Sequence, residues 1–391
     1  MRWIAHIEGC PKRVNHAAVA VNHKIYSFGG YSTGEDCRGY TSMDVHVLNT
    51  HTNRWVKHPV SDLPYFENDD ILPYRRYGHT AVVYKDNIYV WGGRNDRSSC
   101  SVLFKFDTFW HCWMAPPTTG SVPLARDGHT ACVWKNYMFI IGGYEEETDL
   151  FAKQVFYLDL DSLHWSYIVC GGYEPTLRDF HTTVCIDDKI YLFGGRGAML
   201  TTNFQGIQAP LETYCNNVWY LDMKTLNWHC CKATGDIPVG RRSNSAFVHN
   251  NKMYIFGGFN SVKAKHYNDL YMFDPETCVW TRLSPKGKSP CERRRQACAK
   301  VGDKIFIFGG TSPHISRGDG EDLGEAGLDG LVDHSDMFIL DLNPSLKTLC
   351  MMAVREHNLD DSQLPQSLRL ELMNMHLPNK ITMSRPSNSA G

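Results

Sequence analysis

Short apolar runs recur along this chain, and in each copy of the pattern the second run ends at two consecutive glycines. In one copy, residues 130–134 and 137–141 are apolar and flank a Lys-Asn turn, and the second run ends at Gly142 and Gly143. Near-continuous apolar runs bounded by turn residues are typical of strands covered on both faces. A third run at residues 155–159 and then Trp165 complete the copy. The pattern predicts a unit of four short strands.

Six copies share one spacing, an arginine followed sixteen residues later by the first glycine of a Gly-Gly pair. Repeats of about 50 residues with this pattern are typical of kelch proteins. Each kelch repeat builds one four-stranded blade, and blades bury their faces against their neighbours, so the six copies are expected to form one domain. The pairs are Arg13/Gly29, Arg76/Gly92, Arg126/Gly142, Arg178/Gly194, Arg241/Gly257 and Arg293/Gly309.

The last copy lacks the tryptophan of the fourth strand and carries Lys347 at that position. The N-terminal segment Arg2-Trp3-Ile4-Ala5-His6 resembles Arg54-Trp55-Val56-Lys57-His58, the fourth strand of the first copy. We therefore expect the N-terminal strand to complete the sixth blade, which removes a free sheet edge. The predicted fold is an all-β, six-bladed kelch propeller over residues 1–342, closed by the strand around Trp3 and followed by a short C-terminal helical tail.

The composition is that of an ordinary globular protein and argues against several function classes. A formal net charge of −2 provides no field for nucleic acid or a membrane surface. The N-terminus lacks the apolar core of a signal peptide, so we expect a cytoplasmic protein that also reaches the nucleus. The fourteen cysteines include no Cys-x-x-Cys pair, which predicts reduced thiols rather than a zinc site. We expect no metal and no cofactor.

The constant arginines are expected to be structural, because the same side chain stands at the same register in every copy. The informative positions are those that vary directly after each arginine and after each Gly-Gly, since both turns face the same side of a kelch ring. On this side the last three copies supply a basic wall, consisting of Arg196, Arg242, Ser243, Arg294 and Arg295.

Acidic and aromatic residues occupy the varying positions of other copies. Asp127 and Asp179 each follow a repeat arginine, and residues 145–147 and 319–333 form acidic turns. Arginines in a partly closed cleft bind carboxylate or phosphate through charge-assisted hydrogen bonds. The pattern predicts a pocket for a peptide that ends in a free carboxylate and carries a basic side chain nearby. Aromatic residues expected to pack against such a peptide are Tyr77, Tyr144, Phe180 and Phe259.

Beyond residue 342 the apolar pattern becomes helical. Leu346, Leu349, Cys350, Ala353 and Val354 form one stripe at helical spacing. A second amphipathic pattern contains Leu364, Pro365, Leu368 and Leu372. One interpretation of residues 343–380 is two helices that pack on the propeller. The polar segment 381–391 is expected to be disordered.

Both tail patterns resemble the docking motifs of a known family. Ser345-Leu346-x-x-x-Cys350-x-x-x-Val354 resembles the elongin-binding box, and Leu364-Pro365-x-x-Leu368-x-x-x-Leu372 resembles the cullin-2 box that follows it. Directly after six kelch copies, the two motifs make the chain similar to the kelch-domain-containing substrate receptors of cullin-2 ubiquitin ligases. The resemblance implies a non-catalytic substrate receptor that binds elongin B/C and cullin-2 with its RING subunit.

The resemblance also implies what the pocket binds. Receptors of this family recognise substrate proteins through a C-terminal glycine degron, whose carboxylate is held by an arginine after Gly-Gly and by an arginine/serine turn. The matching residues here are Arg196 and the Arg241-Arg242-Ser243 turn. Arg242 stands where a relative carries a smaller polar residue, which fits a different preference upstream of the glycine, and the acidic residues favour Arg or Lys there. Gly391, the last residue, is either incidental or a ligand for the pocket, within one molecule or through self-association.

Two other functions stay open at this point. Asp127 and Asp179 would be the carboxylate pair of a propeller enzyme, but the sequence indicates no nucleophile beside an acid and no metal ligands. A plain kelch scaffold or adaptor, for example one associated with chromatin or the cytoskeleton, would share the ring without needing both tail boxes. The sequence names neither the substrates nor the oligomeric state.

Overall fold

The structure is a computed structural model that describes residues 1–39, 41–59, 72–202, 208–314 and 330–383. Nearly all of its regular structure is β-strand, and its two helices lie near the C-terminus. The all-β class expected from the sequence is therefore confirmed. None of the described helices is long and apolar enough to cross a membrane.

The described strands form six larger antiparallel sheets, one for each repeat. The first contains β2 (Ala17–Val21), β3 (Lys24–Phe28), β4 (Val45–Asn49) and β5 (Arg54–His58). The second contains β6 (Tyr77–Tyr84), β7 (Asn87–Arg94), β8 (Phe104–Asp107) and β9 (Cys112–Met114). The third contains β12 (Thr130–Trp134), β13 (Tyr137–Ile141), β16 (Val155–Asp159) and β17 (His164–Ile168).

The fourth sheet contains β19 (Asp179–Ile186), β20 (Lys189–Thr202), β22 (Val218–Asp222) and β23 (Asn227–Cys230), and β21 (Gln208–Tyr214) pairs with the extended end of β20. The fifth contains β25 (Ser245–His249), β26 (Lys252–Phe256), β29 (Leu270–Asp274) and β30 (Val279–Leu283). The sixth contains β31 (Ala297–Val301), β32 (Lys304–Phe308), β35 (Met337–Asp341) and β1 (Arg2–Ile7).

The remaining strands are short and pair outside the four-stranded frame. One small sheet consists of β11 (Arg126–Asp127), β14 (Tyr144–Glu145) and β15 (Leu150–Phe151). A hairpin is formed by β27 (Phe259–Asn260) and β28 (Lys265–His266). Another two-stranded sheet is formed by β33 (Thr311–Pro313) and β34 (Leu331–Asp333). Parallel additions to the outer strands are β10 (Thr119–Gly120), β18 (Gly171–Gly172), β24 (Thr234–Gly235) and β36 (Thr382–Met383).

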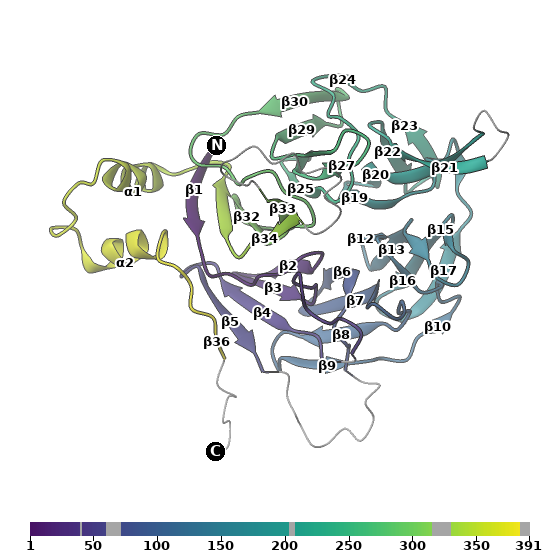
Figure 1. Cartoon of the computed structure of the whole chain (residues 1–391), viewed down its shortest axis with the longest axis horizontal. Helices are drawn as coiled ribbons and strands as arrows, with labels where there is room; N and C mark the ends of the chain where they lie inside the picture. Colours follow the sequence, from purple (N-terminus) through teal and green to yellow (C-terminus); the bar gives the residue numbers. More distant parts are fainter. Residues whose placement is uncertain (40, 60–71, 203–207, 315–329, 384–391) are drawn as a thin grey trace, which may run out of the picture.

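The six sheets lie side by side around a common centre, as Figure 1 shows. Their innermost strands β2, β6, β12, β19, β25 and β31 contact one another in that order, and β31 also contacts β2. Buried apolar side chains fill the spaces between neighbouring sheets, for example between the third and fourth. The ring therefore has its core distributed between the sheets.

A closed circle of backbone hydrogen bonds joins the six sheets at one end. In each of six residues the N–H donates to the carbonyl oxygen of the equivalent residue in the neighbouring sheet, at 2.7–3.1 Å. All six have φ between 48° and 69°, the left-handed region. Because Asn15 donates to Arg295 and Arg295 donates to Ser243, the circle has no free end. The members stand two positions after the repeat arginines: Asn15, Gly78, Gly128, Phe180, Ser243 and Arg295.

The repeat arginines lie beside this circle and tie neighbouring backbones together. Arg76 is fully buried, and its Nη1 donates to the carbonyl oxygen of Gly92 at 3.4 Å. Its own carbonyl oxygen accepts a hydrogen bond from Gly30 of the preceding sheet at 2.8 Å. The same Nη1 bond to the first glycine of the pair recurs in the third to sixth repeats. The arginine side chain thus binds a strand of its own sheet, and the arginine carbonyl group binds the preceding sheet.

Buried histidines fill the next position of the first four repeats. His79 Nε2 donates to the carbonyl oxygen of Phe28 in the preceding sheet at 3.1 Å, and His129 Nε2 is hydrogen-bonded to Thr80 Oγ1 at 2.8 Å. Burial lowers the pKa of His79 to about 3, so its imidazole is neutral at physiological pH. These side chains pack and bridge sheets.

The N-terminal strand supplies the outer strand of the sixth sheet. β1 pairs antiparallel with β35 and places Trp3 opposite Leu340. The Trp3 side chain is 3% exposed and makes edge-on contacts with Phe256 and Phe338, with ring centres 6.0 and 6.2 Å apart. Trp3 therefore packs between the fifth and sixth sheets, as the tryptophans of the other fourth strands do.

Two helices, α1 (Leu346–Glu356) and α2 (Gln366–Asn374), follow the ring and lie outside it beside β1 and β5, as Figure 1 shows. α1 contacts the core through Met352, not through the predicted apolar stripe. Leu346 is 77% exposed and Cys350 is also exposed. The two helices thus pack on the ring, as one interpretation of the sequence expected, through Met352 and Met375 and not through the exposed end of this stripe.

The chain beyond α2 is inserted at the junction of the first and sixth sheets. Asn379 is 7% exposed, its N–H donates to the carbonyl oxygen of Glu8 at 2.7 Å, and its Oδ1 accepts from Trp55 N–H at 3.1 Å. After it, β36 pairs in parallel with β5. The segment that follows the helices thus forms hydrogen bonds both to Glu8, just after β1, and to β5, the outer strand of the first sheet.

Replacing Trp3 with alanine should lower the melting temperature of the whole chain. The substitution leaves a large cavity between two sheets, which costs roughly 3–5 kcal/mol of unfolding free energy. Thermal denaturation followed by circular dichroism measures the shift. Trp110→Ala is the matched control, because Trp110 is 72% exposed and its loss should leave the melting temperature nearly unchanged. Equal melting curves for the two variants would contradict a role for β1 in holding the ring.

Candidate ligand-binding site

A cleft of about 460 Å³ opens at the end of the ring that carries the circle of hydrogen bonds. Backbone pairing builds its walls, because the residue after each repeat arginine pairs with the residue after each Gly-Gly. Each repeat thus places two neighbouring residues at this end of the ring, and some of them line the cleft. The pairs are Val14/Tyr31, Tyr77/Arg94, Asp127/Tyr144, Asp179/Arg196, Arg242/Phe259 and Arg294/Thr311.

Three arginines of the fifth and sixth repeats lie close together, and two of them, Arg242 and Arg295, line the cleft. Arg242 has its nearest acid, Glu212 Oε1, at 3.6 Å. Arg295 Nη1 donates to the hydroxyl of Tyr31 at 2.7 Å. Within the described part of the chain the Arg294 side chain forms no hydrogen bond or ion pair, and its guanidinium lies 4.4 Å from the ring centre of Phe259. We call Arg242, Arg294 and Arg295 the arginine cluster.

The arginine cluster has fewer neighbouring carboxylates than guanidinium groups. Burial and then the neighbouring charges of Arg295 and Arg242 lower the pKa of Arg294 to about 10. Arg294 is only 5% exposed, so water compensates little of its charge. A bound anion would stabilise all three guanidinium groups, and carboxylate is an anion that arginine binds through paired N–H groups.

On the other side of the cleft, Asp127 of the third repeat is a buried acid without a basic partner. Its side chain is 8% exposed and has no hydrogen bond or ion pair with any described residue. Burial raises the pKa of Asp127 to about 6, although Arg94 and other arginines act against the rise. An ionised Asp127 would be stabilised by a bound cation, so the cleft offers a site for positive charge as well as one for negative charge.

Asp179 and Arg196 neutralise each other instead. Arg196 Nε donates to Asp179 Oδ1 at 3.1 Å, Nη2 also contacts Asp179, and Nη1 lies 3.5 Å from Glu212. Arg196 lines the cleft, but its guanidinium already faces two carboxylates. An incoming carboxylate would have to compete with them. The arginine cluster is therefore the stronger anion site.

The predicted site residues divide into three groups. Six of them line the cleft together: Tyr77, Asp127, Phe180, Arg196, Arg242 and Arg295. Arg294 and Phe259 contact each other but are not among the residues that line the cleft, and Ser243 lines the narrower channel of about 130 Å³ beneath it. Tyr144 turns toward its own hairpin, where its hydroxyl donates to Asp149 Oδ1 at 2.6 Å.

The prediction that Arg241 binds a carboxylate in the pocket is wrong. Arg241 is fully buried, its Nη1 donates to the carbonyl oxygen of Gly257 at 3.1 Å, and the same nitrogen forms an ion pair with Asp269. Consecutive residues of an extended chain point to opposite sides, so Arg241 faces the sheet junction while Arg242 faces the cleft. Arg241 is a repeat arginine with the structural role of the other copies.

The acidic turns contribute less than their composition suggests. Glu145 forms an ion pair with the buried Arg126 at 2.6 Å. Asp333 accepts a hydrogen bond from Thr33 Oγ1 at 3.0 Å, which links the sixth sheet to the first. The rest of the acidic run, at residues 319–329, and Gly391 lie outside the described residues.

Sequence reasoning missed several residues of the cleft, among them the charged Glu35, Arg94 and Asp96 that line it, and also Glu212 and Tyr31 beside the arginines. Glu212 lies on β21 and contacts both Arg196 and Arg242, and its Oε2 accepts from the Tyr214 hydroxyl at 3.0 Å. β21 belongs to an extension found in one repeat, so no repeating register could place Glu212. Tyr31 directly follows a Gly-Gly pair, at a position that varies between the repeats. Its place in the repeat could therefore have predicted that it faces the cleft, where it contacts Arg295.

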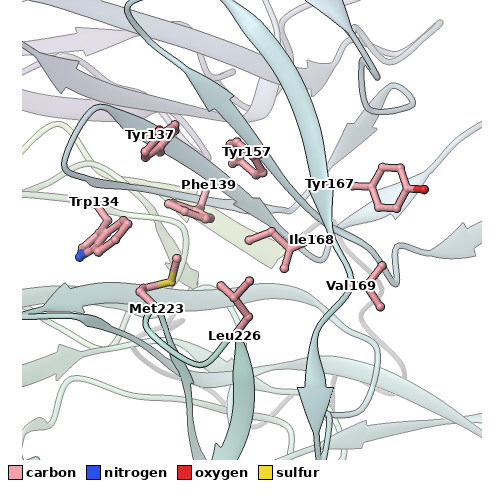
Figure 2. A pocket seen from close by; sticks show the side chains of 9 residues that line it. All are labelled: Trp134, Tyr137, Phe139, Tyr157, Tyr167, Ile168, Val169, Met223 and Leu226. Carbon is pink, nitrogen blue, oxygen red and sulfur yellow. The ribbon is translucent and has the colours of Figure 1, made fainter.

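A second cavity, shown in Figure 2, has different chemistry. It holds about 330 Å³ and lies against the third and fourth sheets. All its lining residues are apolar or aromatic, and none is charged, so it offers no group for a carboxylate. They are Trp134, Tyr137, Phe139, Tyr157, Tyr167, Ile168, Val169, Met223 and Leu226.

Replacing Asp127 with asparagine should stabilise the empty protein at pH 7.5 but not at pH 4. The folded-state pKa of Asp127, about 6, lies above the usual 3.8, so folding favours the protonated form, and stability is lost as pH rises through 6. A shift of this size corresponds to roughly 3 kcal/mol at most. Chemical denaturation at the two pH values measures it.

The matched control is Asp179→Asn, at the same position of the next sheet. Burial raises the pKa of Asp179 as well, but Asp179→Asn also removes the ion-pair partner of Arg196, so this variant should stabilise the protein less than Asp127→Asn does at pH 7.5. If Asp127→Asn stabilises the protein no more than Asp179→Asn does, the idea that Asp127 is an unneutralised buried acid is wrong.

Comparison with known proteins agrees with the repeat pattern. The family described as the KLHDC2/KLHL20/DRC7 Kelch-repeats domain matches residues 78–310, and the Kelch motif matches residues 12–62. Kelch domain-containing protein 3 from Homo sapiens and from Bos taurus are each 45% identical over 387 residues, which covers 99% of this chain and 98% of the relative. Host cell factor 2 from Homo sapiens is 30% identical over 257 residues, covering 62% of this chain and 31% of that protein. The chain therefore belongs to the kelch-repeat family and is a homologue of Kelch domain-containing protein 3.

Proposed function

We propose that this protein is the substrate-recognition subunit of a cullin-2/elongin RING ubiquitin ligase and binds C-terminal glycine degrons in the cleft. In this proposal residues 1–342 are a closed six-bladed propeller, and residues 343–380 carry the elongin-binding and cullin-2 boxes. The protein presents bound substrates for ubiquitination and has no catalytic centre of its own. It acts in the cytoplasm and also in the nucleus.

The observation that carries the proposal is the arginine cluster, which has too few carboxylates around it. Arg294 has no polar partner among the described residues and is nearly buried. Two terminal oxygens of a peptide carboxylate match the paired N–H groups of one guanidinium, and a second guanidinium adds charge. The main chain of an internal peptide segment has no such charge, so for recognition through the main chain the cluster favours a chain end.

Asp127 supports a basic residue just upstream of the terminal glycine. It is buried and unpaired, and a lysine or arginine side chain would supply the missing partner. Phe180, between these two charged groups in ring order, offers an apolar surface to the peptide backbone. The preference for Arg or Lys upstream follows from charge alone.

The tail supports the docking part of the proposal. Ser345 caps α1, with its Oγ accepting from Thr348 N–H at 3.1 Å, so the helix begins at the proposed box. Leu346, Leu349 and Cys350 are exposed along one face of α1. An exposed apolar helix face is typical of a partner-binding surface. In the second box Leu372 is buried, whereas Leu364 and Leu368 are half-buried.

Peptides ending in Arg-Gly with a free carboxylate should bind at least about tenfold more tightly than the same peptides ending in an amide. The amide lacks the charge that the arginine cluster is expected to bind, and a charge-assisted bond lost in a buried site costs more than about 1.4 kcal/mol. Isothermal titration calorimetry with the full chain measures both affinities. Arg242→Gln should remove most of the difference.

Arg282→Gln is the matched control, because Arg282 is exposed on the outer strand β30. This variant should bind both peptides as the unmodified protein does. Equal affinity for acid and amide would defeat the carboxylate part of the proposal, and an upstream Gln that binds as well as Arg would defeat the role of Asp127.

The double variant Leu346→Ala, Cys350→Ala should lose elongin and cullin-2 in co-purification while it keeps peptide binding. Both changes remove exposed apolar atoms and leave the folded core intact. Leu150→Ala, which changes a 63%-exposed leucine on the ring, is the control and should retain both partners. Recovery of both partners by the double variant would contradict the assignment of the elongin-binding box to α1. If the unmodified protein recovers neither partner, a kelch scaffold without these boxes becomes the better function.

A further inference from the structure

Four junctions between neighbouring sheets share one backbone pattern. The segment that leads from one sheet to the next runs in parallel beside the outer strand of that next sheet. At the junction of the fifth and sixth sheets, the Trp3 N–H donates to the carbonyl oxygen of Lys286 at 2.8 Å. A glycine of the segment lies beside the tryptophan of the strand, because a Cβ there would collide with the carbonyl oxygen of the tryptophan. The pairs are Gly120/Trp165, Gly172/Trp228, Gly235/Trp280 and Gly287/Trp3.

The junction of the sixth and first sheets differs, because the segment after α2 is inserted into it. Figure 1 shows this segment running from α2 to β5. The segment that leaves β1 contains Gly9, and a Cβ on Gly9 would collide with the carbonyl oxygen of Asn379. The Asn379 N–H donates to the carbonyl oxygen of Glu8 at 2.7 Å, as the Trp3 N–H does to that of Lys286. The main chain of Asn379 therefore takes the place that an outer-strand tryptophan has at the other junctions.

The side chain of Asn379 completes the other half of this junction. Its Oδ1 accepts a hydrogen bond from the Trp55 N–H at 3.1 Å, so it replaces the carbonyl oxygen that Lys286 offers to Trp3. Asn379 is buried, so an apolar side chain here would leave the Trp55 N–H without an acceptor. One residue thus joins two sheets, with its main chain bound to the sixth and its carboxamide to the first.

Asn379 also stands close to the end of α2, because only residues 375–378 separate them. Within this short connection Met375 is buried in the core shared by the first and sixth sheets. Arg54 Nη1, just before Trp55, donates to the carbonyl oxygen of Leu377 at 2.7 Å. The position of α2 on the ring is therefore coupled to the bonds of Asn379.

We propose that Asn379 is a positioning residue, which fixes α2 at one place on the ring by joining the first and sixth sheets. Loss of its carboxamide should free the segment after α2 and loosen the helix, while the other junctions keep their own bonds. The consequence for ubiquitination rests on the proposed function. If α2 carries the cullin-2 box, Asn379 fixes the distance between the cleft and the docked ligase.

Hydrogen–deuterium exchange of the full chain, read out by peptide mass spectrometry, tests the proposal. Asn379→Ala should raise the exchange rates of α2 and β36 on the order of tenfold, because the segment opens locally once the Trp55 N–H has lost its acceptor. The third and fourth sheets should exchange as in the unmodified protein. Unchanged exchange in α2 would overturn the proposal. Faster exchange confined to β1 and β5 would overturn it too, because Asn379 would then serve the ring alone.

Asn343→Ala is the matched control, because Asn343 is exposed and precedes α1. This variant should exchange as the unmodified protein does, and a rise in α2 as large as that of Asn379→Ala would count against the proposal. The experiment contains no elongin or cullin-2, so its outcome is independent of the co-purification that tests the docking boxes.

Gly9→Ala reaches Asn379 from its other side and decides the question if Asn379→Ala does not fold. Gly9 has φ of 76°, and the added Cβ would displace the Asn379 main chain, so α2 should again exchange faster. Gly235→Ala introduces the same kind of collision at a junction without an inserted segment and should loosen only its own outer strand, β30. Equal exchange of α2 in the two glycine variants would show general strain and overturn the proposal.

Discussion

The closed circle of six backbone hydrogen bonds is the constraint on which the cleft depends. It requires a left-handed backbone at every member, which glycine adopts without strain and other residues adopt at a cost of roughly 1 kcal/mol or more each. Only Gly78 and Gly128 are glycines, whereas Phe180, Ser243 and Arg295 accept the strain with φ of 48°, 55° and 60°. Those side chains line the cleft or the channel beneath it, so the strained positions coincide with the candidate site.

The same frame gives adjacent arginines opposite roles. Arg241 and Arg293 point into the sheet junctions, where backbone carbonyl oxygens and the carboxylates of Asp269 and Asp336 satisfy them. One residue later, Arg242 lines the cleft with Glu212 as its one neighbouring acid, and Arg294 is nearly buried beside it without an ion pair among the described residues. One set of arginines therefore stabilises the fold. The other set lowers the stability of the fold, because its charges are buried with too few carboxylates nearby, and a bound anion would restore that stability.

Much of the fold and part of the site could be predicted because a repeat fixes register. Comparing equivalent positions of the repeats predicts the four-stranded units and the pairing of the N-terminal strand around Trp3. The same comparison predicts that Asp127 and Arg242 line one cleft. The rest depends on contacts that no repeat encodes. Glu212 lies in an extension of one sheet, and Asn379 is inserted at a junction more than three hundred residues away from it in sequence.

The rigid circle also explains why the charges of the cleft do not cancel one another. Asp127 belongs to the third sheet and Arg242 to the fifth, and Phe180 of the fourth stands between them in ring order. A flexible loop would let the acid and the arginines collapse into an ion pair. Here the backbone hydrogen bonds hold each residue in its own sheet, so Asp127 stays unpaired while it is nearly buried. Neutralising both sides needs a molecule that carries a negative group and a positive group at the matching separation. The unsatisfied charges are thus a property of the fixed ring, and the proposed ligand is one with the opposite pattern of charge.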